Sequence, residues 1–170
     1  MFLVRLIYAS TAVAVLSPAD YQSILITSIK NNSKSDITGM LCCDGQYFLQ
    51  CLEGSRQAVN NTYSRILNDP RHNNVMLLNY GEVATRHFSD WAMGYVALSS
   101  DAAADVKPDV LLRFVNDAET AIRPKPSAIS MTIAHNQFMK YSTKRQFDPY
   151  ALSDASSLAL LDDLGKIFAE

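Results

Sequence analysis

The sequence predicts an α+β fold: a ferredoxin-like βαββαββ sandwich built on a five-stranded mixed sheet. Three observations lead to this prediction. Strand-like and helix-like segments alternate in that order over residues 2–98, a tight-turn dipeptide separates the second and third strands, and a serine precedes each helix-like segment. The 170 residues are 48% hydrophobic and 19% charged, which suits one compact core with a modest extension.

Residues 2–9 predict the first strand, because apolar side chains stand on both of its alternating faces and favour an interior position. Ser17-Pro18-Ala19-Asp20 predicts the start of a helix. Ser17 would be the N-cap, Pro18 the first helical residue, and Asp20 the acid three residues after the cap. Its apolar positions recur with helical spacing as far as Lys30, and the polar residues 31–33 are expected to end it.

The hairpin and the second helix complete the pattern. Asp44-Gly45 lies between two strand-like runs, 37–43 and 46–53, and is a strong signal for a tight turn. A second helix capped by Ser55 and two more strands are expected at 56–68, 75–84 and 93–98. In such an order two helices cover one face of the sheet, so the other face needs a separate cover.

The C-terminal region predicts helices beyond the sheet. Helical spacing of apolar residues at 106–118 and 127–141 makes either segment, or both, a candidate cover for the second face. A last amphipathic segment, 153–169, can pack on the domain or on another chain. The apolar stripe of this last segment consists of Leu158, Leu161, Leu164, Ile167 and Phe168. We therefore divide the chain into a domain at 1–100 and a helical extension at 101–170.

Charge and hydropathy exclude several functional classes. A formal net charge of −2, without a basic tract, disfavours a general binder of nucleic acid or of membrane surfaces. No apolar stretch approaches the roughly 18 residues that a membrane span needs. Arg5 interrupts an N-terminal apolar run that is too short for a signal peptide. These features predict a cytoplasmic protein.

The sequence also lacks the usual signatures of an enzyme. Cys42, Cys43 and Cys51 match neither a disulfide framework nor a zinc site and are expected to be buried thiols. His72 and His87 have no ligand partner at helical spacing, and no glycine pattern forms a dinucleotide fingerprint. We predict no metal site and no catalytic centre.

Two polar residues stand out by strand parity. Tyr8 shares a face with apolar neighbours on the first strand, and Gln50 does so on the third. A buried polar group without a partner costs about 1–3 kcal/mol, so a Tyr8–Gln50 pair would satisfy part of that need. Taken singly, Tyr8 can also be a core tyrosine with its hydroxyl at the rim, and Gln50 a solvent-facing strand residue. In the same way Asn31-Asn32 can be a helix C-cap.

Six separated motifs together resemble the BLUF (blue light using flavin) photoreceptors in order and spacing. They cover residues 2–98 approximately: LIYAS at 6–10, NN at 31–32, ITGML at 37–41, FLQCLEG at 48–54, YSRILNDPRH at 63–72 and FSDWAMG at 88–94. The resemblance implies a stand-alone blue-light sensor rather than an enzyme. Its cofactor would be FAD, with FMN and riboflavin left open.

The resemblance also implies a role for particular residues. The flavin ring would lie between the two helices, sandwiched by Ile24 and Ile66, with Tyr8 and Gln50 at its N5 and O4 edge. The other implied cofactor contacts are Phe48 in the pocket, Asn32 at the C4 carbonyl and N3, Asn31 towards the ribityl and phosphate side, and Arg65, Asp69 and His72 around the exit of the tail. Without the resemblance, Arg65, Asp69 and His72 can equally form a solvated charged patch.

The resemblance further implies that light rearranges the hydrogen bonds around Tyr8 and Gln50, and that Trp91 and Met93 relay the change. Which of the latter two lies near Gln50 in the dark stays open, as does the choice between rotation and tautomerisation of the glutamine. No segment after residue 98 resembles an output domain, so we expect a separate effector or response-regulator partner and, from the C-terminal stripe, a homo-oligomer. The alternatives are a flavin-dependent oxidoreductase and a flavin-free interaction module.

Overall fold

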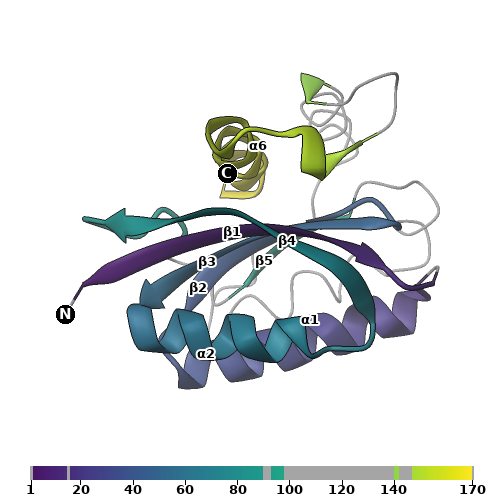
Figure 1. Ribbon diagram of the computed structural model, residues 1–170, viewed down its shortest axis with the longest axis horizontal. Coiled ribbons are helices and arrows are strands. Elements are labelled where there is room, and N and C mark those ends of the chain that lie inside the picture. Colours follow the sequence, from purple (N-terminus) through teal and green to yellow (C-terminus); the bar gives the residue numbers. More distant parts are fainter. Residues whose placement is uncertain (1, 15, 90–92, 98–139, 142–146, 170) are drawn as a thin grey trace.

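The computed structural model describes residues 2–14, 16–89, 93–97, 140–141 and 147–169 and confirms the α+β class (Figure 1). Its elements are β1 (Leu3–Ala12), α1 (Pro18–Lys34), β2 (Thr38–Cys43), β3 (Tyr47–Ser55), α2 (Arg56–Leu67), β4 (His72–Val83), β5 (Gly94–Ala97), the 3-10 turn η1 (Pro149–Ala151) and α6 (Asp154–Ala169). Among the described residues, no helix is long and apolar enough to span a bilayer.

The strands lie in the order β4-β1-β3-β2-β5. The pairs β1–β3, β1–β4 and β2–β3 are antiparallel, whereas β5 runs parallel to β2. Helices α1 and α2 lie under one face of the sheet, and α6 crosses the other (Figure 1). The sheet is therefore the middle layer of three, and its central strands β1 and β3 are covered on both sides.

The α1 and α2 face is packed by side chains that recur at every second strand position. Tyr21, Leu25 and Ile29 of α1 and Val59 of α2 are buried against it. The strands contribute Val4, Leu6, Tyr8, Leu41, Cys43, Phe48 and Leu52 to this cluster. Most of these are aliphatic or aromatic, so Tyr8 and Gln50 bring their polar groups into apolar surroundings.

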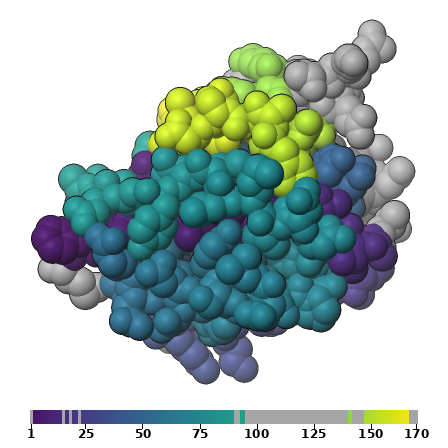
Figure 2. Space-filling view, in the orientation of Figure 1, coloured from purple at the N-terminus to yellow at the C-terminus, as the bar shows by residue number. Residues whose placement is uncertain are grey.

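The opposite face is covered by α6, which fills the position that the sequence left open. Leu160, Leu161 and Leu164 are fully buried against Ile7 and Leu49 of the sheet. Leu158 packs partly buried on the same cluster, and Figure 2 shows the yellow C-terminal segment seated directly on the rest of the molecule. The inference of an interchain contact from this stripe was wrong for Leu161 and Leu164, because the chain's own sheet buries them. Ile167 and Phe168 lie among the residues whose side chains are not described.

The local signals for α1 were correct at its start and wrong at its end. Ser17 accepts from the Asp20 backbone N–H while Asp20 accepts from the Ser17 N–H, which is the predicted capping box. The helix continues to Lys34 and does not end at Lys30. Asparagine costs only tenths of a kcal/mol in a helix, too little to stop one that packs on a sheet. Asp36, at a φ of 51°, ends it instead.

The hairpin forms as its dipeptide predicts. Gly45 has a φ of 97°, and the Asp44 carboxylate accepts from the backbone N–H groups of Gln46 and Tyr47. β4 starts earlier than expected, at His72, and two register shifts against β1 accommodate the extra residues. Cys42, Cys43 and Cys51 are free and buried, as predicted. The helices expected at 106–118 and 127–141 lie outside the described residues, apart from the last two positions.

Replacing Leu161 by alanine tests the role of α6 as part of the core. Truncation of a fully buried leucine should lower the free energy of unfolding by about 2–5 kcal/mol. The control Leu67→Ala removes a side chain that is 51% exposed and should stay within about 0.5 kcal/mol of the parent protein. Urea unfolding followed by circular dichroism measures both, and equal effects of the two substitutions would show that α6 does not contribute to the core.

Candidate functional site

Tyr8 and Gln50 form the polar centre of the site. They are Cα partners in the central β1–β3 pair, only 2% and 5% exposed. The Tyr8 hydroxyl donates to Oε1 of Gln50. Nε2 of the same amide donates to Sδ of Met93 over 3.3 Å. The structure therefore brings together the two residues that strand parity predicted and confirms that they satisfy one another.

Met93 takes the place beside the glutamine that the sequence left open between two residues. It is 1% exposed and packs in the α1 and α2 cluster, directly before β5. A thioether sulfur accepts hydrogen bonds and donates none, so Met93 favours the amide orientation in which the NH2 group faces it. Trp91 lies outside the described residues.

A cavity opens next to this pair, between α1 and α2. About 440 Å³ here is free of protein atoms, and part of this space is open to solvent. Ile24 from α1 and Ile66 from α2 line two of its sides. The other lining residues are Tyr8, Ser28, Leu41, Phe48, Gln50, Asp69, Arg71 and His72. Aliphatic walls with a few polar groups at the edges are what a site for a planar organic ligand requires.

Three further polar side chains of the cavity, Asp69, Arg71 and His72, come from the loop after α2 and the start of β4. Nε of Arg71 donates to both Asp69 oxygens, at 2.9 and 3.1 Å. These hydrogen bonds from Arg71 lower the pKa of the Asp69 carboxyl, against the opposing effect of its burial. Nδ1 of His72 lies 2.9 Å from the Ser10 hydroxyl, and its ring meets Phe48 edge-on. One side of the cavity is thus lined by an ion pair and an imidazole.

Burial also determines the protonation state of Tyr8. Desolvation raises the pKa of its phenol far above the ordinary value, with smaller contributions in the same direction from Tyr63 and Asp69. The ring of Tyr63 lies 5.6 Å from that of Tyr8. The hydroxyl therefore stays a donor at any physiological pH, and the amide oxygen of Gln50 is its acceptor.

Not every residue suggested by the sequence lines the cavity. Asn31 and Asn32 lie in the last turns of α1, the first half-buried and the second buried, and neither is among the lining residues. Arg65 is exposed on α2, where it donates to Thr62 over 2.8 Å. The sequence reasoning missed Arg71, although it lies between two residues that were named. The described residues hold no cluster of potential metal ligands.

The fold and the cavity together define a small α+β domain for binding an organic ligand. A family model described as "Sensors of blue-light using FAD" matches residues 3–94. This match covers more than half of the chain, and the chain belongs to the BLUF family of flavin-binding blue-light sensors.

Known relatives extend this result. Subunit beta of the photoactivated adenylate cyclase of Euglena gracilis is 36% identical over 92 residues, which are 54% of this chain and 11% of that subunit. The BlrP1 structure of Klebsiella pneumoniae with FMN and cyclic diGMP has 32% identity and a TM-score of 0.53, covering 66% of this chain and 30% of that one. The BlsA ground state has a TM-score of 0.70 over 99% of this chain and 89% of its own. At 24% identity it shows the fold alone.

The histidine in the cavity predicts an acid-dependent loss of stability. Burial lowers the pKa of His72 from its ordinary value of 6.5, although Asp69 opposes the shift. The unfolded chain therefore binds more protons below this value, and the free energy of unfolding falls as the pH is lowered through 6.5. Urea unfolding at pH 7.5 and 5.5 should show a smaller loss in His72→Gln than in the parent protein. An equal loss in both would mean that His72 titrates normally.

Proposed function

We propose that this chain is a blue-light photoreceptor that holds a flavin non-covalently between α1 and α2 and signals through the hydrogen bonds of Tyr8 and Gln50. The observation that carries the proposal is the buried contact series from Tyr8 through Gln50 to Met93 at the wall of the cavity. Membership of a family of flavin-binding sensors supports it.

The residues present fit a flavin. Ile24 and Ile66 stand on the two helices between which a planar ring would lie, and Phe48 adds an aromatic wall. Tyr8 and Gln50 would meet the polar edge of the ring. We assign the remaining contacts as the family resemblance implies: Asn32 at the C4 carbonyl and N3, Asn31 nearer the ribityl side, and Arg65, Asp69 and His72 around the tail. Arg71, paired with Asp69, joins this set.

FAD is the flavin of the family, and bound flavin supplies the absorption of blue light and a ring that accepts an electron. The chain's own part is to hold the hydrogen bonds of Tyr8 and Gln50 in one arrangement and to change that arrangement after light is absorbed. Gln50 suits this task because its amide has one acceptor and two donors, which exchange places when the group turns over or tautomerises. In the turned amide the oxygen would face Met93, whose sulfur has no proton to give. Met93 therefore stabilises the resting orientation, and loss of its contact with Gln50 is the first change that the protein would register.

The output would pass to a separate effector or response-regulator protein. The sensing domain would be residues 1–100, and 101–170 the extension that carries the signal. The buried free thiols suit the reducing conditions of the cytoplasm, where we expect the protein to act. The flavin-dependent oxidoreductase and the flavin-free module remain testable alternatives. The first predicts a flavin that NADPH bleaches in the dark, and the second predicts colourless protein.

Substitution of Tyr8 by phenylalanine should retain the flavin and abolish the small reversible red shift of its absorption bands after blue light. Phenylalanine preserves the volume of the ring, but it removes the donor to Gln50 and is harder to oxidise. The matched control is Tyr80→Phe, since the Tyr80 hydroxyl has no hydrogen-bond partner among the described residues and its side chain packs on the same core cluster. Absorption spectra before and after illumination measure both. A full red shift in Tyr8→Phe would falsify the role of Tyr8.

We also propose a homo-oligomer, now on the support of the edge strand β4. Met76 and Leu77 are 44% and 48% exposed there, and an edge strand with apolar side chains readily pairs with another chain. Size-exclusion chromatography with light scattering, in darkness and under blue light, should give a mass above that of one chain. Leu77→Lys should lower this mass, whereas Leu67→Lys, on the exposed side of α2, should not. A monomeric parent protein in both conditions would exclude the oligomer.

A further inference from the structure

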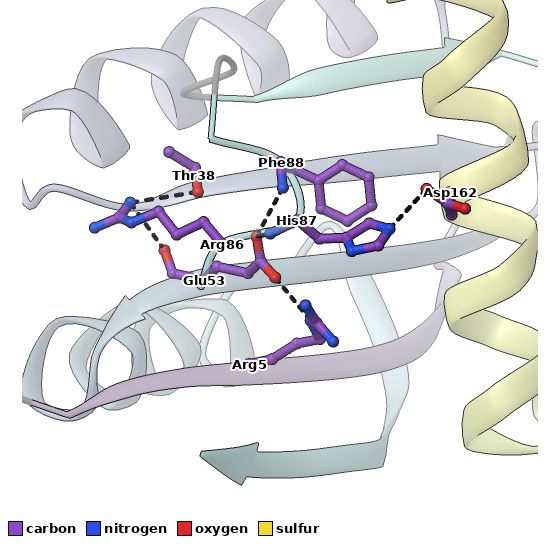
Figure 3. Close-up of polar contacts among 7 residues, drawn as sticks. All are labelled: Arg5, Thr38, Glu53, Arg86, His87, Phe88 and Asp162. Carbon is purple, nitrogen blue, oxygen red and sulfur yellow. Dashed lines mark hydrogen bonds and ion pairs between the residues drawn. The ribbon is translucent and has the colours of Figure 1, made fainter. Parts of the chain in front are cut away.

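Glu53 is a fully buried carboxylate on the α6 face of β3, three residues after Gln50. Its Oε1 accepts from Nε of Arg5 at 2.7 Å. Its Oε2 accepts from two consecutive backbone N–H groups, those of His87 at 2.7 Å and Phe88 at 2.9 Å (Figure 3). One charged side chain thus holds the segment that follows β4. Because the carboxylate is buried, moving this segment away would strip it of two of its three donors.

The neighbouring residue strengthens this attachment. The Arg86 guanidinium donates to the backbone oxygen of Asp36 at 2.8 Å and to its carboxylate at 2.7 Å. It also approaches the Thr38 hydroxyl at 3.3 Å, as Figure 3 shows. Residues 86–88 are therefore fixed to β3 and to the start of β2.

Two of these three residues, His87 and Phe88, contact α6. Nε2 of His87 lies 2.6 Å from Oδ1 of Asp162, so the imidazole donates to an α6 carboxylate. The Phe88 ring is buried in the cluster that contains Leu161 and Leu164. A displacement of residues 86–88 would break the His87–Asp162 contact and disturb the packing of Phe88 on the leucines of α6.

The other end of this segment reaches the glutamine. Met93, which accepts from Gln50, comes only five residues after Phe88. Strand β3 thus contacts both ends of the stretch from 86 to 93, through Gln50 on one face of the sheet and Glu53 on the other. Along the chain, this stretch joins the residue that contacts Gln50 to the residue that contacts Asp162 of α6.

We propose that Glu53 is a positioning residue for this stretch, and that the His87–Asp162 contact couples it to α6. In this arrangement a loss of the Gln50–Met93 contact loosens residues 86–88 and, through Asp162, the docking of α6. The inference deepens the proposed function and rests on it for its response to light. The coupling itself belongs to the resting structure and can be tested in darkness.

Backbone amide exchange followed by NMR tests the coupling on the full flavin-loaded chain, using Asp162→Asn. Coupling free energies are reciprocal, so weakening the contact at α6 should also free residues 86–88. In the dark we expect the amides of His87 and Phe88 to exchange about fivefold faster or more in Asp162→Asn than in the parent protein. The control Asp163→Asn removes the same charge from the same helix, but its partner is Tyr141. It should leave both amides unchanged. Unchanged amides in Asp162→Asn would overturn the coupling.

Illumination tests the direction of the signal. In the parent protein, blue light should speed the exchange of the α6 amides at 160–165 by about fivefold or more. In Asp162→Asn the red shift should remain, while this light-induced difference should be lost. Absence of a red shift in the parent protein would count against the proposed function. The amide exchange of Asp162→Asn in darkness would still decide whether residues 86–88 are coupled to α6. A normal red shift with identical α6 exchange in light and dark would overturn the relay alone.

Glu53→Gln gives a second, independent readout. The substitution keeps the shape of the side chain but removes its charge, so the amides of His87 and Phe88 should exchange faster even where the fold is retained. If Glu53 only stabilised the fold, the flavin spectrum would be unaffected. As a positioning residue it should shift the dark absorption maximum, because Met93 would no longer be held on Gln50. An unaltered spectrum in folded Glu53→Gln would contradict this role.

Discussion

In the centre of the sheet, β1 and β3 pair in a register that sets Tyr8 opposite Gln50, and the functional site depends on this pairing. A slip by one residue would turn every side chain of one strand to the other face and separate the phenol from the amide. Both strands are covered on two sides, by α1 and α2 below and by α6 above, so burial of apolar side chains on both faces opposes such a slip. The same burial keeps Tyr8 protonated.

The two faces of β3 hold different chemistry. Gln50 lies on the cavity side as a neutral amide, whose donor and acceptor groups exchange places when it turns over. Glu53 lies on the α6 side as a charged group whose partners are fixed by its burial. The neutral amide of Gln50 and the charged carboxylate of Glu53 therefore lie on opposite faces of the same strand, three residues apart. The segment after β4 contacts both groups: Met93 accepts from Gln50, and the backbone of His87 and Phe88 donates to Glu53.

Local signals in the sequence predicted most of the fold. Ser17, the Asp44-Gly45 turn and the parity of Tyr8 and Gln50 were each read correctly, since they depend on neighbours in the chain or on the period of a strand. The end of α1 was predicted wrongly, whereas the choice between Trp91 and Met93 and the surface that buries the α6 stripe were left open. All three depend on which distant surface meets them. Nothing in the local sequence distinguishes Glu53, because an acid on a strand is ordinarily exposed. Its role depends on hydrogen bonds from Arg5 and from the backbone of residues 87 and 88, which are distant in the chain.

The placement of the three thiols has a consequence for durability. Burial raises the pKa of Cys42 and Cys51 well above the ordinary value and that of Cys43 to about 12. Oxidants attack the thiolate far more readily than the thiol, and here the thiolate is scarcely populated and buried away from solvent. With a flavin bound as proposed, the excited ring would be an oxidant inside the domain. Because the three sulfurs are protonated and buried, the chain should then form sulfenic acids and unintended crosslinks only slowly.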